Sequence, residues 1–229
     1  LSRSPVFVFE TLSEAYDFLP WLKAHTDEIR AAAESTTRHG KLLSIEKHPI
    51  HNRVIMEFKY NTAEAAGQNM VTMATDAACR WIRENYKSKN PFRHLVESNF
   101  CCDKNPAQKT ILHGRGHHVI SSCTVPNALL KKLLRVDVDD IVRCINDLHL
   151  GSQLAGVVGL NLHTSNALAA LYLALGQDVA CVAENCVGIG TYEKIGGDLF
   201  VTLSMPSITV GTVGGATRLT QQHRNLELL

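Results

Sequence analysis

Four polar residues stand at the two ends of an apolar stretch in the last third of the chain: His163, Asn166, Gln177 and Asp178. The stretch itself, residues 165–175, consists mostly of alanine and leucine. This composition predicts a helix, and a helix that is apolar on every side belongs inside a protein. Capping by Ser165 or Asn166, with Gly176 ending the helix, would account for the polar ends. Alternatively, these groups need partners in a buried site, and the pattern leaves both interpretations open.

Asp103 and Lys104 are adjacent charged residues in a loop rich in asparagine and cysteine. One interpretation is a solvated surface pair, because exposed ion pairs are common and weak. A buried carboxylate near a lysine behaves differently, since it lowers its own pKa and raises that of the lysine. Asp178 could be such a carboxylate, or a helix-end aspartate that is hydrogen-bonded to the backbone.

Three histidines, His113, His117 and His118, raise the question of a metal site. Gly114 and Gly116 break any helical face at this point, and no cysteine or acidic residue completes a ligand set at a recognisable spacing. We therefore expect no metal.

The first hundred residues have a pattern that predicts strands and helices in the order βαββαβ. Strands are expected at 6–9, 42–45, 54–58 and 94–97, with a turn at 48–52. A capping box from Thr11 to Glu14 opens the first helix, and Pro20 should kink or restart it. Thr62 could cap the second helix, which runs to about Tyr86. Its apolar stripe is expected at Met70, Met73, Ala77 and Trp81. This order is ferredoxin-like and assigns residues 1–99 to one domain.

The remaining residues, 100–229, predict part of a larger, helix-rich domain, so the fold class is α+β. Helices are expected at 127–134, 138–148, 165–175 and from 219 onward. Strands are expected at 119–125, 186–190 and 199–204, the last two joined by a turn at 194–198. The glycine-rich segment 205–216 should be extended.

The composition excludes several classes of function. The formal net charge is +1, which gives no electrostatic footprint for nucleic acid. No apolar run approaches the length needed to span a bilayer, and no signal peptide opens the chain. The seven cysteines are odd in number and show no disulfide framework, which favours a reducing cytosol and a cytoplasmic location.

Three ordered motifs resemble the 3-hydroxy-3-methylglutaryl-CoA (HMG-CoA) reductase family over essentially the whole chain. The residues 103–106, Asp-Lys-Asn-Pro, resemble its D-K-K-P. The run 163–180 resembles its H-A-A-N followed by G-Q-D-A-A, and 211–216 resembles its G-T-V-G-G-G. Three motifs in the right order are a far more specific signal than one glycine-rich match. In addition, 64–69 is similar to a cofactor motif, D-A-A-G-Q-N, and 35–38 is similar to S-T-S-R.

The resemblance implies an oxidoreductase that reduces HMG-CoA to mevalonate and CoA with two NADPH, and NADPH is expected rather than NADH. Lys104 would stabilise the negative charge that develops on the thioester oxygen, and Asp178 would hold Lys104 and keep it charged. The implied substrate-binding residues are Arg38, Asp103, Asn105, His163 and Asn166. The implied cofactor-binding residues are Glu64, Ala65, Gly67, Gln68, Asn69, Gly211, Thr212, Gly214 and Gly215.

The resemblance also implies partners. HMG-CoA and coenzyme A are the expected ligands, and a homodimer or a dimer of dimers is expected to form the active site at the subunit interface. The family's catalytic glutamate lies upstream of the position matched by Leu1, and its catalytic histidine lies beyond Leu229. We therefore expect this chain to be a fragment that is inactive alone.

Three departures from the family pattern favour an alternative. Asn105 replaces the second lysine of D-K-K-P, Glu64 replaces an aspartate, and Asp147 stands where the family often has a lysine. A non-catalytic paralogue that binds CoA or a nucleotide would tolerate these changes. A ferredoxin-like regulatory module would explain only the first hundred residues.

Overall fold

The computed structural model describes all 229 residues and has the predicted α+β fold class. It divides into two compact units. Unit 1 comprises Leu1–Asp103 with Gly211–Gly214, and unit 2 comprises Lys104–Val210 with Gly215–Leu229. The sequence placed a single boundary after residue 99. In the structure the second unit begins at Lys104, and the glycine-rich segment 211–214 belongs with unit 1.

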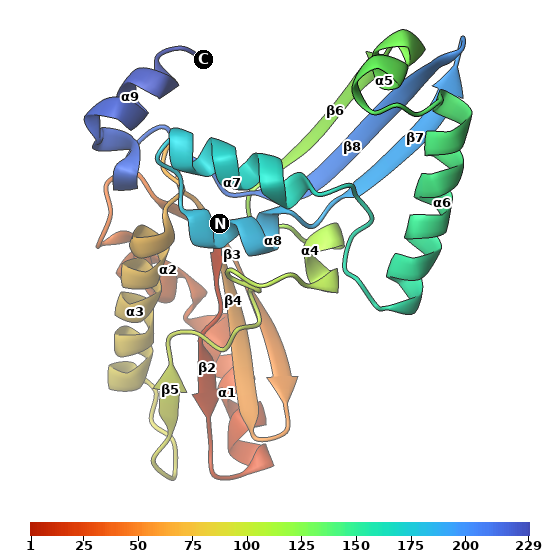
Figure 1. Cartoon of the computed structure of the whole chain (residues 1–229). Coiled ribbons are helices and arrows are strands. Elements are labelled where there is room, and N and C mark those ends of the chain that lie inside the picture. Colours follow the sequence, from red (N-terminus) through yellow and green to blue (C-terminus); the bar gives the residue numbers. More distant parts are fainter. The chain divides into compact units, whose positions relative to one another are not determined.

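Unit 1 is built on one antiparallel sheet (Figure 1). Its elements are β1 (Ser2–Arg3), β2 (Val6–Val8), α1 (Leu12–Ala24), α2 (Thr26–Glu34), β3 (Lys41–Ile50), β4 (Arg53–Asn61), α3 (Gln68–Asn85) and β5 (Arg93–Leu95). Strand β4 pairs with β3 on one side and with both β1 and β2 on the other, and β2 pairs with β5. With β1 and β2 counted as one interrupted strand, this is the predicted ferredoxin-like arrangement.

One large hydrophobic core stabilises unit 1. The three helices contribute fully buried side chains to it, among them Phe18, Ile29 and Ile82, and the sheet contributes Phe7 and Phe58. Burial of such side chains stabilises a fold by about 1.5–3 kcal/mol each. The helices therefore cover one face of the sheet.

The predicted capping box is confirmed, whereas a restart of the helix at Pro20 is wrong. The Thr11 hydroxyl accepts a hydrogen bond from the Glu14 N–H, and the Glu14 carboxylate accepts one from the Thr11 N–H. Pro20 lies inside α1 without ending it, and the break before α2 is at His25. Proline has no N–H, so one backbone hydrogen bond of α1 is missing at this turn. Packing of the helix face against the rest of unit 1 keeps the turn helical.

Helix α3 begins at Gln68, so the prediction of a start at Thr62 is wrong. The segment 64–66 is drawn away from the helix because it pairs with the glycine-rich segment: the Thr212 N–H donates to the Glu64 carbonyl at 2.9 Å. The predicted stripe is wrong in part, since Met73 is 62% exposed whereas Trp81 packs against the core. A second apolar stripe one residue later in the sequence is buried instead: Val71, Ala74, Ala78 and Ile82.

Unit 2 contains a three-stranded antiparallel sheet in the order β6–β8–β7, with helices around it (Figure 1). Its elements are α4 (Gln108–Leu112), β6 (His117–Val125), α5 (Asn127–Leu133), α6 (Val138–Leu154), α7 (Thr164–Ala174), the 3₁₀ turn η1 (Val179–Cys181), α8 (Val182–Asn185), β7 (Ile189–Ile195), β8 (Asp198–Ile208), the 3₁₀ turn η2 (Gly215–Arg218) and α9 (Thr220–Leu226). The predicted turn at 194–198 is confirmed as the β7–β8 hairpin, but β7 begins at Ile189 rather than 186.

Helix α7 differs from its prediction in two respects. Gly176 follows it with a φ of +69° and ends it as predicted, but the N-cap residue is His163, and neither Ser165 nor Asn166 caps it. The expectation of burial on every side is also wrong. Leu171 and Leu173 are 51% and 63% exposed, because unit 2 covers only the face that carries Leu168 and Tyr172.

No helix of the structure is long and apolar enough to cross a membrane. None of the seven cysteines is paired in a disulfide bond.

Candidate active site

Lys104 and Asp178 form an ion pair in unit 2. The Lys104 Nζ lies 2.9 Å from Asp178 Oδ2, and the two side chains are 42% and 35% exposed. The pair is therefore half-buried, and water reaches part of both side chains. An ammonium in such a position can stabilise negative charge on a substrate oxygen.

The local backbone fixes Asp178 just past the end of α7. The helix stops at Ala174, so Asp178 is the N-cap residue of the turn η1 and accepts a hydrogen bond from the Ala180 N–H at 3.1 Å. Partial burial of the carboxylate raises its pKa, but the hydrogen bond and positive charge of Lys104, with the Ala180 N–H, outweigh that effect. The net pKa of Asp178 therefore lies below its ordinary value.

A second ion pair lies next to Lys104 and is buried. Arg115 Nη2 donates to Glu184 Oε1 at 2.9 Å and to Oε2 at 3.0 Å. The two side chains are only 4% and 2% exposed. Glu184 Oε2 also accepts the backbone N–H of Lys104 at 2.8 Å. The buried pair is therefore bonded directly to the residue that carries the exposed one.

Asn185 extends this network to α7 and β8. Its side-chain oxygen accepts hydrogen bonds from the Tyr172 hydroxyl at 2.5 Å and from the Thr209 N–H at 3.1 Å. Its amide nitrogen donates to the Ser207 carbonyl. Burial raises the pKa of Tyr172, which keeps its hydroxyl protonated as a donor. The segment from Asp178 to Asn185 is thus tied to both neighbouring elements.

In unit 1, the two segments expected to bind the cofactor lie against each other. Ala65 and Val213 form a parallel bridge, and the Val213 N–H donates to the Glu64 carbonyl at 3.3 Å. A Cβ at Gly211 would lie 2.4 Å from the Ala66 nitrogen, so only glycine allows this approach.

The start of α3 beside these segments suits an anionic or hydroxyl-rich ligand. Gly67 is the N-cap residue, no side chain caps the helix, and no acidic residue stands in its first turn. Backbone N–H groups at such a helix N-terminus favour negative charge. Glu64 and Thr212 are exposed next to it, and their side chains could bind ribose hydroxyls. The residues present therefore fit a dinucleotide.

Arg3 connects two of the predicted residues of unit 1. Its Nη1 lies 3.0 Å from Asp103 Oδ2 and 3.1 Å from Glu97 Oε2, and its Nη2 donates to Gln68 Oε1 at 3.4 Å. Asp103 is thus paired with a buried arginine of its own unit.

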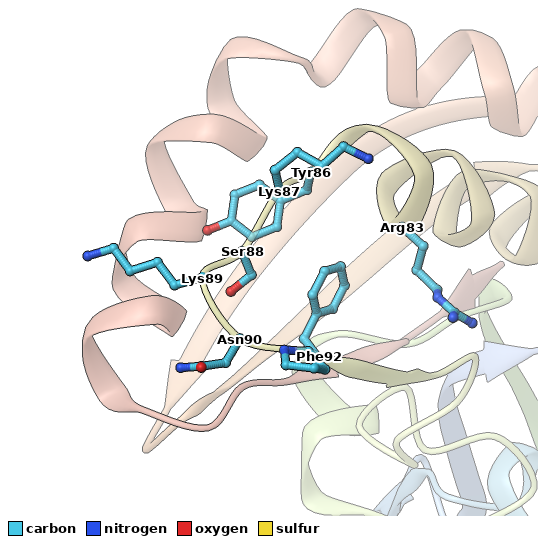
Figure 2. A pocket seen from close by; sticks show the side chains of 8 residues that line it. Arg83, Tyr86, Lys87, Ser88, Lys89, Asn90 and Phe92 are labelled. Atoms are coloured by element: carbon cyan, nitrogen blue, oxygen red, sulfur yellow. The ribbon is translucent and has the colours of Figure 1, made fainter.

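The cavity in Figure 2 lies elsewhere. It has a volume of about 440 Å³ and is lined by Arg83 of α3 and by residues 86–92, which follow that helix. The side chains of Arg83, Lys87 and Lys89 point in different directions (Figure 2), so they do not converge on one ligand. No predicted site residue lines this cavity.

A mixed cluster of carboxylates and imidazole lies on β3 and β4, where ligand atoms of Glu46, His48 and Glu57 come within 4.8 Å of one another. The Lys59 ammonium lies 2.5 Å from Glu46 Oε1, so a lysine already balances the charge of this carboxylate. The cluster does not include the three histidines considered from the sequence.

Comparisons with known proteins identify the family. The model of the hydroxymethylglutaryl-coenzyme A reductase family matches residues 1–229. The chain belongs to this family. The 3-hydroxy-3-methylglutaryl-coenzyme A reductase of Haloferax volcanii is 35% identical over 100% of this chain and 56% of the relative, and that of Aeropyrum pernix is 36% identical over 100% and 54%. The chain therefore spans about half the length of these relatives.

A solved reductase structure has a similar fold. The class II 3-hydroxy-3-methylglutaryl-CoA reductase of Streptococcus pneumoniae, bound to NADPH in open conformations, matches with a TM-score of 0.61. The match covers 100% of this chain and 56% of that chain at 14% identity. At this identity the likeness establishes the fold alone.

Five residues that the family resemblance implies for the site are exposed, and their roles are not tested by the structure. Arg38 is exposed after α2, and no hydrogen bond or ion pair links it to another predicted residue. Asn166 lies exposed in the first turn of α7 and makes no hydrogen bond with Lys104 or Asp178. His163 is exposed with a left-handed φ of 54°. Asn105 and Gly215 are exposed as well, and the roles of all five stay predictions.

Sequence reasoning missed three charged residues of this chain: Arg3, Arg115 and Glu184. Arg115 stands between two glycines, and Glu184 is the only charged residue between Asp178 and Glu193. A lone charge in an apolar segment is a sign of a buried ion pair. The sequence does not indicate which residue pairs with Glu184, however, because 69 positions separate it from Arg115.

Proposed function

We propose that this chain is part of a hydroxymethylglutaryl-CoA reductase that reduces HMG-CoA to mevalonate and CoA with two NADPH, in the mevalonate pathway of isoprenoid synthesis. The observation that carries the proposal is the 2.9 Å contact between Lys104 Nζ and Asp178 Oδ2. Membership of the family supports the reaction type. Because the chain spans about half the length of its relatives, the activity is proposed for the whole protein.

The chemistry follows from charge development at the substrate oxygen. Each reduction step places negative charge on the oxygen of a thioester or aldehyde, and the Lys104 ammonium stabilises that charge or donates a proton to it. Asp178 is proposed to keep the lysine protonated, because loss of the lysine proton would remove the attraction between the two opposite charges. Partial exposure of the ammonium leaves room for the substrate oxygen beside Asp178.

Unit 1 is proposed to bind the dinucleotide, which supplies the hydride. The N-terminus of α3 would face a phosphate, and Glu64 and Thr212 would bind ribose hydroxyls. Gly211 to Gly214 would let the nicotinamide approach the backbone closely. Comparison of activity with NADPH and NADH tests the preference for NADPH.

The proposed assembly is a homodimer or a dimer of dimers, in a cytoplasmic protein. Membership of the reductase family, in which the active site is expected to lie between subunits, supports this assembly. Light scattering of the full-length protein measures the oligomeric state directly.

The decisive experiment replaces Lys104 in the full-length protein. We expect Lys104→Met to lower kcat about 10²–10³-fold, the range seen when one oxyanion-stabilising group is removed. Lys194→Met is the matched control, because Lys194 also pairs with an exposed aspartate, Asp139, at 2.7 Å. The control should keep its activity. Equal activity of the two variants, measured as NADPH oxidation with HMG-CoA, would refute the role of Lys104.

Three substitutions favour a second candidate, a non-catalytic paralogue that binds CoA or a nucleotide: Asn105, Glu64 and Asp147. If the full-length protein binds NADPH but does not reduce HMG-CoA, Asn105→Lys restores the second lysine of the motif. Activity gained by that change would assign the loss of reduction to this position.

A further inference from the structure

Lys104 has a backbone conformation that an L-residue seldom adopts. Its φ is +59°, in the left-handed region where the Cβ crowds the following carbonyl. Non-glycine residues persist there only when the surrounding structure fixes them, and such residues cluster at functional sites. The backbone N–H of Lys104 donates a hydrogen bond to Glu184 Oε2 at 2.8 Å.

Glu184 is itself fixed by a rigid partner. Arg115 binds both carboxylate oxygens of Glu184, and the Arg115 N–H donates to Ser207 Oγ at 2.9 Å. A Cβ at Gly114 or Gly116 would lie 2.0 Å or 2.2 Å from a carbonyl oxygen of β8. The glycines thus let the backbone of Arg115 lie directly on β8. The position of the Glu184 carboxylate is therefore set by the sheet.

One short segment holds Lys104 at both ends. Asp178 contacts its ammonium at 2.9 Å, and Glu184 accepts its backbone N–H at 2.8 Å. Both acids lie within the stretch η1–α8 and its N-cap. Fixing the backbone and the side-chain tip together restricts the orientations of the lysine.

We propose that Glu184, held by Arg115, is a positioning residue that directs the Lys104 ammonium toward the substrate oxygen by fixing the Lys104 backbone. The inference rests on the proposed function, because the ammonium is the group that meets the oxygen. Glu184 acts through Lys104 and does not itself touch the substrate.

The test separates positioning from simple stabilisation of the fold. Removing one member of a buried pair leaves an unpaired charge, whereas an uncharged pair of similar volume is usually tolerated. The informative comparison is therefore R115M/E184Q against R115M/E184L. The glutamine can still accept the Lys104 N–H, and the leucine cannot, while both variants lack the charges. Tyr172→Phe is the structural control, because it removes a hydrogen bond of Asn185 without touching Lys104.

The first readout requires no catalysis. The pKa of Asp178, followed by carboxyl-carbon NMR of this chain, is held low in part by the nearby ammonium. We expect it to stay low in R115M/E184Q and in Tyr172→Phe. In R115M/E184L it should move toward the ordinary value of 3.8, because Lys104 no longer lies against Asp178. An unchanged low pKa in R115M/E184L would overturn the proposal.

The second readout is kinetic and uses the full-length protein. We expect kcat of R115M/E184L to fall at least about tenfold below that of R115M/E184Q, with KM for the thioester nearly unchanged, as for a group that acts in the transition state. Equal kcat values would also overturn the proposal. If instead the NMR result holds and the wild-type protein reduces no HMG-CoA, the positioning stands and the proposed function fails.

A further variant covers the case in which R115M/E184L does not fold. Glu184→Asp keeps the charge pair with Arg115 but withdraws the carboxylate from the Lys104 N–H by one methylene. It should raise the pKa of Asp178 in the same direction, and a low pKa in this variant would count equally against the proposal.

Discussion

Two ion pairs of unit 2 share one neighbourhood but differ in their exposure to water. The side chains of Arg115 and Glu184 are 4% and 2% exposed, whereas those of Lys104 and Asp178 are 42% and 35% exposed. Every oxygen of Glu184 already has a protein donor. The buried pair therefore has a structural role, whereas the half-exposed pair includes the ammonium that is proposed to meet the substrate oxygen. This difference in exposure distinguishes Lys104, the proposed catalytic group, from the Arg115–Glu184 pair that is proposed to position it.

The largest expected effect is on stability and concerns the buried pair. Arg115→Met should lower the free energy of unfolding by about 3–5 kcal/mol, because it leaves the Glu184 charge buried without its partner. The double variant R115M/E184L should recover much of this loss, although the Lys104 N–H then lacks its acceptor. Urea unfolding of the three proteins measures the difference. A single variant no less stable than the double variant would mean that Glu184 is not held as a buried charge.

The sequence predicted most strands and helices of both units, and the hydrophobic cores show why burial was harder to predict. The core of unit 1 is one continuous cluster, and its local signals, such as the capping box at Thr11, agree with its long-range packing. Unit 2 has two small clusters, one around Leu168 and one around Leu130. Local composition predicted α7 correctly as a helix, but burial depends on which faces the rest of the unit covers.

Local sequence also could not place residues whose environment is made by distant segments. The start of α3 moved to Gln68 because the segment 64–66 pairs with Thr212 and Val213, far away in the chain. The proximity of Lys104 and Asp178 was an implication of the family motif, and the structure brings these two side chains into contact. Arg115 and Glu184 belong to none of the motifs used, so their pairing could only come from the fold.

A smaller effect on stability is expected for the half-exposed pair. Lys104→Met should change the free energy of unfolding by at most about 1 kcal/mol, because ion pairs that water reaches contribute little. Lys194→Met removes a similarly exposed pair with Asp139 and should have an effect of the same size. Denaturant unfolding of the two variants checks this. A loss for Lys104→Met as large as that for Arg115→Met would remove the distinction between the two pairs.

The smallest expected effect is the pH dependence that Asp178 adds. Its pKa in the folded chain lies below the ordinary value of 3.8, so its ionised form stabilises the fold. That contribution is fully present above the unfolded-state pKa and is lost as the pH falls through the folded-state pKa. The difference in unfolding free energy between wild type and Asp178→Asn should therefore shrink from about pH 6 to about pH 3. Asp147→Asn, at an exposed position on α6, is the control for replacing an aspartate by asparagine. If the Asp178→Asn difference stayed constant over this range, the carboxylate would not be held by Lys104 in solution, and the half-exposed pair would form only when a ligand or another part of the protein orders it.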